Sequence, residues 1–545
     1  MAHFKERFRV SPENLGYVLV AAPILIYWLY WTFNPSYWFN GDPAAFYFLD
    51  SLSVFIGRTY VYVDHPGTPM QIIGSLLLAL TYPFLGGTQA FINFYITRPE
   101  AFFLMAHLFL LAMNLIAAVV FYDTARTTLR HNQILGALSL SLIYFTLHPH
   151  SFPSLTFWSH NSFNFPFGTL WLLWLYRGLR ADKEIDKWKL ILLGIGAGVL
   201  AIAQVYFFAW VIAGIFSIFV FTQRLTRSFK SAVSSSLYIF FGSILGIVSM
   251  LLPIYKELPR FVNWFMDVAT HEGLYGTGQS GILSSKLLST SLYYWWLSIR
   301  PMMIVLALTL VILGALAYFK TRFSIKVSPS TFAMITVLLF MLGLILLMLV
   351  KTAGKLRYSL SLAAILPVLI LLVLKLAETI FQKNHKWVNL FYVTVFIGIA
   401  VTLTQQINLQ QRRAFVEQDA RLAKSQAITR LAREIGVPEK ELVVVFAYGV
   451  PIQCSGMLEA SNWTGAFTQE ISSMCHNQHA IFDTEVELNT ARPLVEIQEI
   501  DWDLVIWPGN GSDLPEYLES VGAVNIPKAW HVRRSPWFFI RPDVE

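Results

Sequence analysis

Charged residues are scarce in this sequence. They make up 13% of its 545 residues, against 55% that are hydrophobic, whereas soluble domains carry about 25% charged residues. Apolar runs such as residues 331–350 recur along most of the chain, and each provides the roughly 20 helical residues needed to cross a bilayer. One oversized soluble core would leave these runs unexplained. We therefore predict an α-helical polytopic membrane protein.

Cysteine is almost absent, since only Cys454 and Cys475 occur. No C-x-x-C pair or histidine spacing accompanies them, so a zinc site is not expected. We place both on the oxidising side of a membrane, where a pair favours a disulfide; two unpaired buried thiols are the alternative. A cleavable signal peptide is also missing, because no small-residue cleavage site follows the first apolar run, about 15–33, which we interpret as a retained span.

Basic residues outnumber acidic ones, with a net charge of +7 and a pI near 9.1. They cluster in short loops between apolar runs, which is the positive-inside pattern of membrane proteins and not a nucleic-acid surface. A cytoplasmic N-terminus followed by about eleven alternating helices places nearly every basic loop inside. The predicted helices are residues 15–33, 100–121, 133–147, 161–176, 190–204, 206–222, 232–252, 301–319, 329–350, 358–378 and 388–405.

Residues 34–99 interrupt this alternation. If residues 69–86 were a full span, the later helices would reverse direction and the basic segment 123–131 would face outward. We therefore predict that residues 34–99 form one external segment, whose apolar part lies along the membrane surface or dips into it as juxtamembrane helices. Three prolines favour an interrupted element over a straight span: Pro66, Pro69 and Pro83.

Two later regions are also predicted to be external. Residues 253–300 form a loop that is too long for a simple connector. From about residue 406 the composition changes: residues 411–436 have helical spacing, and three short apolar runs, 441–448, 503–509 and 535–542, read as strands. We predict a transmembrane module, residues 1–405, followed by an extracytoplasmic α/β domain, residues 406–545.

Asp42 is the strongest candidate for chemistry. It lies about ten residues after the first span, in "NGDPAAFYF", among aromatic and apolar neighbours that would partly desolvate its carboxylate. A partly desolvated carboxylate suits a general base that takes a proton from an acceptor hydroxyl. The alternative is a helix N-cap, because Asp followed by Pro is a common helix start. One residue can serve both roles.

One span, then an external loop with an acidic residue and a His-Pro pair, His65-Pro66, at the head of an apolar helix, resembles the GT-C glycosyltransferases. The pattern is most similar to protein O-mannosyltransferases and lipid A aminoarabinose transferases, and it covers residues 15–375. The resemblance implies inverting transfer of a sugar from a polyprenyl-phosphate carrier to an acceptor hydroxyl at the extracytoplasmic face. It favours a bacterial inner or plasma membrane over the endoplasmic reticulum, and leaves open whether the acceptor is protein, lipid or glycan.

Under this resemblance, Asp42 sits where the family's catalytic acid lies. His65-Pro66 matches the first two residues of a His-Pro-Pro element, but Gly67 replaces the second proline. The loop 148–161, where some relatives carry a second acid, has none and contains His148, His150 and His160 instead. A two-carboxylate or metal-bridged mechanism is therefore not expected; no cofactor is predicted, and a divalent metal is left open.

A basic loop precedes the span predicted at 358–378. Lys351, Lys355 and Arg357 face outward in this topology, against the positive-inside bias, and need a local anion. A lipid-linked phosphate would supply it, with headgroup snorkelling as the alternative. GT-C relatives carry a similar basic stretch. We predict that three more residues bind the donor phosphate: Arg58, His65 and Arg300.

The polar segment "HEGLYGTGQSG", residues 271–281, contributes His271, Glu272 and Tyr275. We interpret it as a mobile flap over the acceptor side of the site, together with Asp64; a plain flexible loop is the alternative. The competing function is a transporter or flippase for an amphipathic anion. Transporters place ionisable residues in the middle of the membrane, and the predicted spans contain few.

Overall fold

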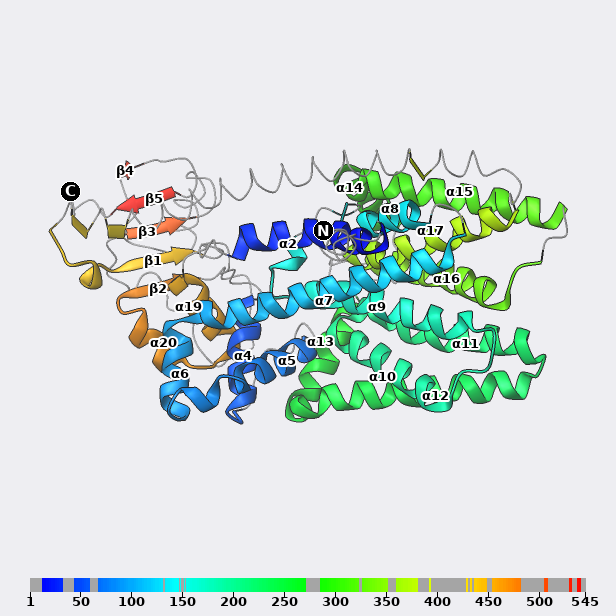
Figure 1. Ribbon diagram of the computed structural model, residues 1–545. Coiled ribbons are helices and arrows are strands. Elements are labelled where there is room, and N and C mark those ends of the chain that lie inside the picture. Colours follow the sequence, from blue (N-terminus) through cyan, green and yellow to red (C-terminus); the bar gives the residue numbers. More distant parts are fainter. Residues whose placement is uncertain are drawn as a thin grey trace, which may run out of the picture.

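The computed structural model describes most of the helical part of the chain and short stretches of the rest. The described residues are 12–32, 44–58, 67–130, 133–146, 148, 151, 153–270, 285–322, 326–350, 359–380, 392–393, 428–429, 432–433, 436–447, 453–481, 504–507, 529–531 and 537–540. Long helices run side by side and form an elongated bundle, with a small sheet beyond one of its ends (Figure 1).

The helices of the first half of the bundle are α2 (Pro12–Thr32), α4 (Phe46–Phe55), α5 (Thr68–Ala79), η2 (Tyr82–Phe84), α6 (Thr88–Thr97), α7 (Pro99–Thr128), α8 (Gln133–Thr146), η3 (Pro153–Leu155) and α9 (His160–Arg180). Those of the second half are α10 (Lys187–Ala203), η4 (Val205–Phe207), α11 (Phe208–Thr226), α12 (Phe229–Leu251), η5 (Leu252–Glu257), α13 (Leu258–Thr270), α14 (Ser285–Ser298), α15 (Arg300–Arg322), α16 (Pro329–Val350) and α17 (Leu360–Ile380). Each of the predicted helices up to residue 378 has a counterpart here, and nearly all of the last, 388–405, lies outside the described residues.

The protein is an α-helical membrane protein. Among the described residues, 6 helical segments are long and apolar enough to cross a membrane, or 7 if one bent pair is counted as a span. These segments are α7, α15, α16, α17, residues 205–226 and residues 229–267. Others are shorter, such as α8 with 14 residues and α10 with 17. The count of eleven spans therefore stays a prediction.

The segment 34–99 is interrupted, as its prolines suggested. Residues 68–84 and 88–97 form two helical pieces that are bent by 117° at their junction. Helix α4 does not lie free on a surface: Phe48 packs on Phe102 and Phe103 of α7, with ring centroids 4.9 and 5.8 Å apart. The predicted loop 253–300 is also largely helical in its described part, where it forms most of η5, α13 and α14.

Helices α10 and α12 pack through glycines that bring their backbones together. A Cβ built on Gly194 would lie 2.3 Å from the carbonyl oxygen of Ile239, and one on Gly242 would lie 2.2 Å from that of Ile191. Gly198 and Gly246 repeat the arrangement one turn further on. Small residues at this four-residue spacing allow close helix contact in membranes, where dispersion forces replace the hydrophobic effect between helices.

Charged side chains gather where α7 and α9 end. Arg177 Nη2 lies 2.8 Å from Asp123 Oδ2, and Arg126 Nη2 lies 3.3 Å from Asp123 Oδ1. Tyr17, near the start of α2, donates a hydrogen bond of 3.2 Å to Asp123 Oδ1. We call this the basic end of the bundle, defined by Asp123, Arg126, Arg177 and Arg180. The start of α2 therefore lies at the basic end.

The C-terminal strands form one five-stranded sheet with the order β2-β1-β3-β5-β4. The strands are β1 (Val444–Ala447), β2 (Gln478–Ile481), β3 (Leu504–Trp507), β4 (Ala529–His531) and β5 (Trp537–Ile540). Strand β1 pairs parallel with β2 and β3, while β5 pairs antiparallel with β3 and β4. The three predicted strands correspond to β1, β3 and β5. Strands β2 and β4 were not predicted, and most of the predicted helix 411–436 lies outside the described residues.

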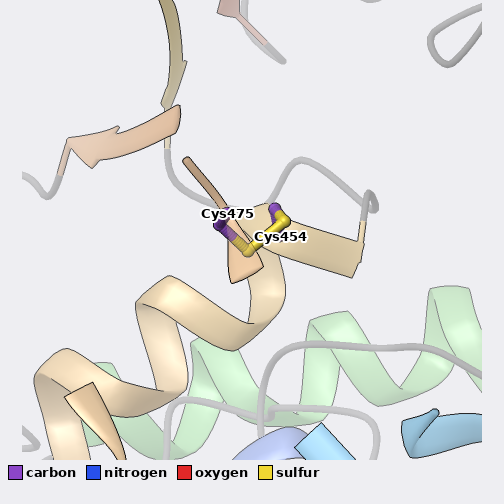
Figure 2. Close-up of a disulfide and its surroundings, with 2 residues drawn as sticks. All are labelled: Cys454 and Cys475. Atoms are coloured by element: carbon purple, nitrogen blue, oxygen red, sulfur yellow. A yellow bond between two sulfur atoms is a disulfide. The ribbon is translucent and has the colours of Figure 1, made fainter. Parts of the chain in front are cut away.

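Two helices accompany the sheet, α19 (Gln453–Thr464) and α20 (Thr468–Met474). Cys454 in α19 is joined to Cys475, directly after α20, by a disulfide across a Cα–Cα distance of 5.6 Å (Figure 2). The predicted pairing is therefore present in the structure. Helix α19 contacts α4, and α20 contacts α6, so these helices join the sheet to the first half of the bundle.

Candidate functional site

Most of the predicted site residues lie outside the described residues. These are Asp42, Asp64, His65, His271, Glu272, Tyr275, Lys351, Lys355 and Arg357. The described residues next to them show where three of these segments join the bundle. The chain enters the helical turn leading into α4 directly after Asp42 and Pro43, reaches Gly67 after His65-Pro66, and reaches Ser359 two residues after Arg357.

Tyr47 joins two of these segments to α9. It is fully buried, and its hydroxyl lies 2.8 Å from Nδ1 of His160, the first residue of α9. The ring of Tyr47 also fills the space beside Gly67, where an added Cβ would lie 2.1 Å from Tyr47 Cε1. The segments that follow Asp42 and His65 therefore meet at one side chain, together with the start of α9.

The same contact explains why residue 67 is a glycine. The φ angle of Gly67 is −87°, which other residues also adopt, so backbone freedom does not require glycine here. The requirement comes from space, because any side chain at residue 67 meets the Tyr47 ring. Glycine at residue 67 thus has a packing cause.

His148 connects the histidine loop to the segment that carries the predicted phosphate-binding cations. Its Nε2 lies 2.8 Å from the hydroxyl of Ser359, and both side chains are buried. His148 and His160 therefore both contact residues adjoining predicted site segments, while His150 lies outside the described residues. We call this region the polar end of the bundle, defined by Tyr47, Gly67, His148, His160 and Ser359.

A buried chain of amides extends from His160 into the bundle. Asn161 Nδ2 lies 3.2 Å from His160 Nε2, and Gln204, after α10, donates to Asn161 Oδ1 at 2.8 Å. Asn164 donates to Gln204 Oε1 at 3.4 Å, and its own Oδ1 has no hydrogen-bond partner among the described residues. Amides both donate and accept, so this chain of hydrogen bonds ties the start of α9 to the residue after α10 inside the bundle. These amides were not predicted as site residues, although polar amides inside apolar runs are a signal of function.

Asp50 is a second residue that the sequence analysis missed. It is fully buried in α4, one turn after Tyr47, and its Oδ2 accepts a 2.8 Å hydrogen bond from Gln71 Nε2 in α5. A buried carboxylate requires such bonds because desolvation is costly. Asp50 therefore helps to hold α5, and with it the segment that contains His65, against α4. In the sequence, Asp50 could have been recognised as the acidic residue within the apolar run "FYFLDSLSVF".

The two described arginines of the predicted phosphate site lie in different surroundings. The Arg58 guanidinium stacks 5.0 Å from the ring centroid of Phe467, and its Nη1 lies 3.9 Å from Glu470 Oε1. It also lines a pocket of about 270 Å³ that includes Lys256. Arg300 opens α15, and its guanidinium lies 5.3 Å from the ring centroid of Trp296 in α14. Arg58 therefore contacts the C-terminal helices, whereas Arg300 contacts α14.

No family model matches the chain, and no curated protein matches it. Among the described residues, no group of three or more His, Cys, Asp or Glu side chains is arranged to hold a metal ion.

Proposed function

We propose that the protein is an integral membrane glycosyltransferase of the GT-C type, which takes a sugar from a polyprenyl-phosphate carrier and passes it to an acceptor hydroxyl. One observation carries the proposal: segments far apart in the sequence converge at the polar end. Tyr47 contacts Gly67 and His160, and His148 contacts Ser359. The chain next to the candidate base, the His-Pro pair and the basic loop is therefore held in one region of the molecule.

The orientation of the bundle agrees with chemistry outside the cytoplasm. The basic end carries the cations that the positive-inside rule assigns to the cytoplasm, and the start of α2 lies there. The polar end lies at the opposite ends of α7 and α9, and the sheet lies beyond it (Figure 1). An extracytoplasmic α/β domain, residues 406–545, fits this placement, and so does its disulfide, because disulfides persist in oxidising compartments.

The described contacts on either side of residues 388–405 are compatible with the predicted last span. Glu378, in the last turn of α17, accepts a 2.8 Å hydrogen bond from the backbone of Arg130, close to the basic end. Helix α19 contacts α4, at the polar end. Residues 388–405, almost all outside the described residues, are apolar enough to join these two ends as a helix, so we keep them as a predicted span.

In the proposed reaction, Asp42 takes the proton of the acceptor hydroxyl. The acceptor oxygen attacks the anomeric carbon, the bond from that carbon to the phosphate oxygen breaks, and configuration inverts. The phosphate leaves with the electron pair, and we assign its charge stabilisation to Lys351, Lys355 and Arg357 with Arg58, His65 or Arg300. We assign contacts with sugar hydroxyls to the amide chain that starts at Asn161, and the acceptor side to Asp64 and residues 271–281.

The test is sugar transfer by the purified protein in nanodiscs, with a panel of synthetic polyprenyl-phosphate sugars and with donor affinity measured separately. We expect Asp42→Asn to lower transfer by at least about 10²-fold and to leave donor affinity unchanged. Arg357→Ala should weaken both, because a phosphate interaction begins in the ground state. Asp182→Asn makes the same carboxylate-to-amide change in an exposed turn after α9 and serves as the matched control.

The outcomes separate the two functions. Normal transfer by Asp42→Asn would mean that Asp42 only caps a helix. Movement of an intact lipid-linked anion between leaflets of proteoliposomes, with no sugar released from its phosphate, would identify a transporter and overturn the proposal.

A further inference from the structure

An apolar groove of about 570 Å³ lies on the bundle where α11, α12 and α16 meet. Apart from Ser236, every side chain that lines it is hydrophobic, and the Ser236 hydroxyl donates to the backbone oxygen of Ile215 at 3.2 Å. The groove is open at its outer side: Val233, Leu237 and Phe240 are exposed by 36 to 45%. Its volume lies within the range of ligand sites, about 300–1,000 Å³.

The groove has the depth of one leaflet. Helix α12 begins at the basic end, because α9, α10 and α11 alternate in direction through short connections. Val233 lies three residues and Phe240 ten residues beyond Lys230, which at 1.5 Å per residue corresponds to about 5 and 15 Å. The hydrocarbon core of a bilayer is about 30 Å thick, so the groove spans the leaflet at the basic end.

Cations flank the groove at that end. Arg224 lies in the last turn of α11, Arg227 between the helices and Lys230 in the first turn of α12. No acidic residue occurs from residue 187 to residue 256, which includes all of α11 and α12. Arg224 is fixed on the Phe332 ring of α16, 3.3 Å from its centroid. Arg227, in the turn, and Lys230 are exposed. An apolar groove of leaflet depth beside these exposed cations matches a molecule with an anionic head and a hydrocarbon chain.

We propose that this groove binds an anionic phospholipid of the leaflet at the basic end. One acyl chain lies between α11 and α12, and the headgroup phosphate is held by Arg227 and Lys230. A zwitterionic lipid offers the same chain, but its ammonium group opposes these cations. The groove lies about one leaflet or more from the polar end, so lipid binding there is independent of the proposed transferase activity.

Lipid binding is tested by native mass spectrometry and by thermal unfolding in detergent, with dioleoyl phosphatidylglycerol and dioleoyl phosphatidylcholine as probes. We expect phosphatidylglycerol to bind more tightly and to raise the unfolding temperature more. Arg227→Gln with Lys230→Gln should weaken phosphatidylglycerol binding about 30-fold, roughly fivefold for each cation near the anionic head. Lys183→Gln with Lys189→Gln removes the same charge elsewhere at the basic end and should leave binding unchanged.

The hydrocarbon part of the site has its own variant. Leu237→Trp fills the groove without altering charge, and it should weaken binding of dioleoyl phosphatidylglycerol but not that of the short-chain dihexanoyl lipid. Equal binding of the two headgroups to the unaltered protein would overturn the proposal. So would wild-type binding by the Arg227→Gln, Lys230→Gln variant or by Leu237→Trp.

Discussion

A methyl group on Gly67 should destabilise the protein through one contact at the polar end. The Cβ of Gly67→Ala would lie 2.1 Å from Cε1 and 2.4 Å from Cζ of Tyr47, far inside van der Waals contact. The Tyr47 ring is held in place, because the residue is fully buried and its hydroxyl is hydrogen-bonded to His160. The backbone at Gly67 has φ −87°, so alanine adds no backbone strain and the clash is isolated.

The magnitude follows from two costs. Forcing an extra carbon into a packed core costs about 1–3 kcal/mol. If the Tyr47 ring moves to make room, the buried His160 loses its hydrogen bond to the Tyr47 hydroxyl, which costs about 1–3 kcal/mol more. The protein relaxes by whichever of these two changes costs less free energy, so we expect Gly67→Ala to lower the free energy of unfolding by about 2 kcal/mol.

A double-mutant cycle with Tyr47 separates this contact from other effects. Tyr47→Ala removes the ring, so Gly67→Ala in that background should cost close to nothing, and the coupling should reach about 2 kcal/mol. Tyr47→Phe keeps the ring and should leave the full clash, while losing only the bond to His160. Unfolding in detergent, followed by tryptophan fluorescence, measures all variants. A neutral Gly67→Ala, or additive costs in the cycle, would refute the packing described at the polar end.

Three further outcomes are expected. Gly194→Ala should destabilise the protein by at least about 1 kcal/mol, because the added Cβ would lie 2.3 Å from a backbone oxygen, which cannot turn away. Gly343→Ala should be neutral or slightly stabilising, because its added Cβ would have no neighbour within 4 Å. Equal unfolding temperatures of the two variants would contradict this. Replacing both cysteines by serine should cost about 3 kcal/mol if the disulfide is unstrained, and free thiols found by mass spectrometry in protein purified without reductant would count against the pairing. A membrane-impermeant thiol reagent should label Ala90→Cys and Pro515→Cys from the same, non-cytoplasmic side. Labelling of the two cysteines from opposite sides would contradict the predicted topology.

The sequence by itself determined the helical membrane class and most helix positions. Hydropathy is a local property, and a run such as residues 331–350 requires a helix in a bilayer whatever its neighbours are. The short apolar runs that became β1, β3 and β5 were visible for the same reason. The disulfide could be predicted because the chain contains only two cysteines, which leaves a single pairing.

The tertiary structure alone decided which polar groups meet. Tyr47 and His160 are separated by 113 residues, and His148 and Ser359 by 211, so no local pattern links them. The burial of α4 and the role of Asp50 also depend on packing against distant helices. Gly67 shows the physical reason most clearly: its φ angle would suit many residues, and only the ring of Tyr47, brought there by the fold, makes glycine necessary.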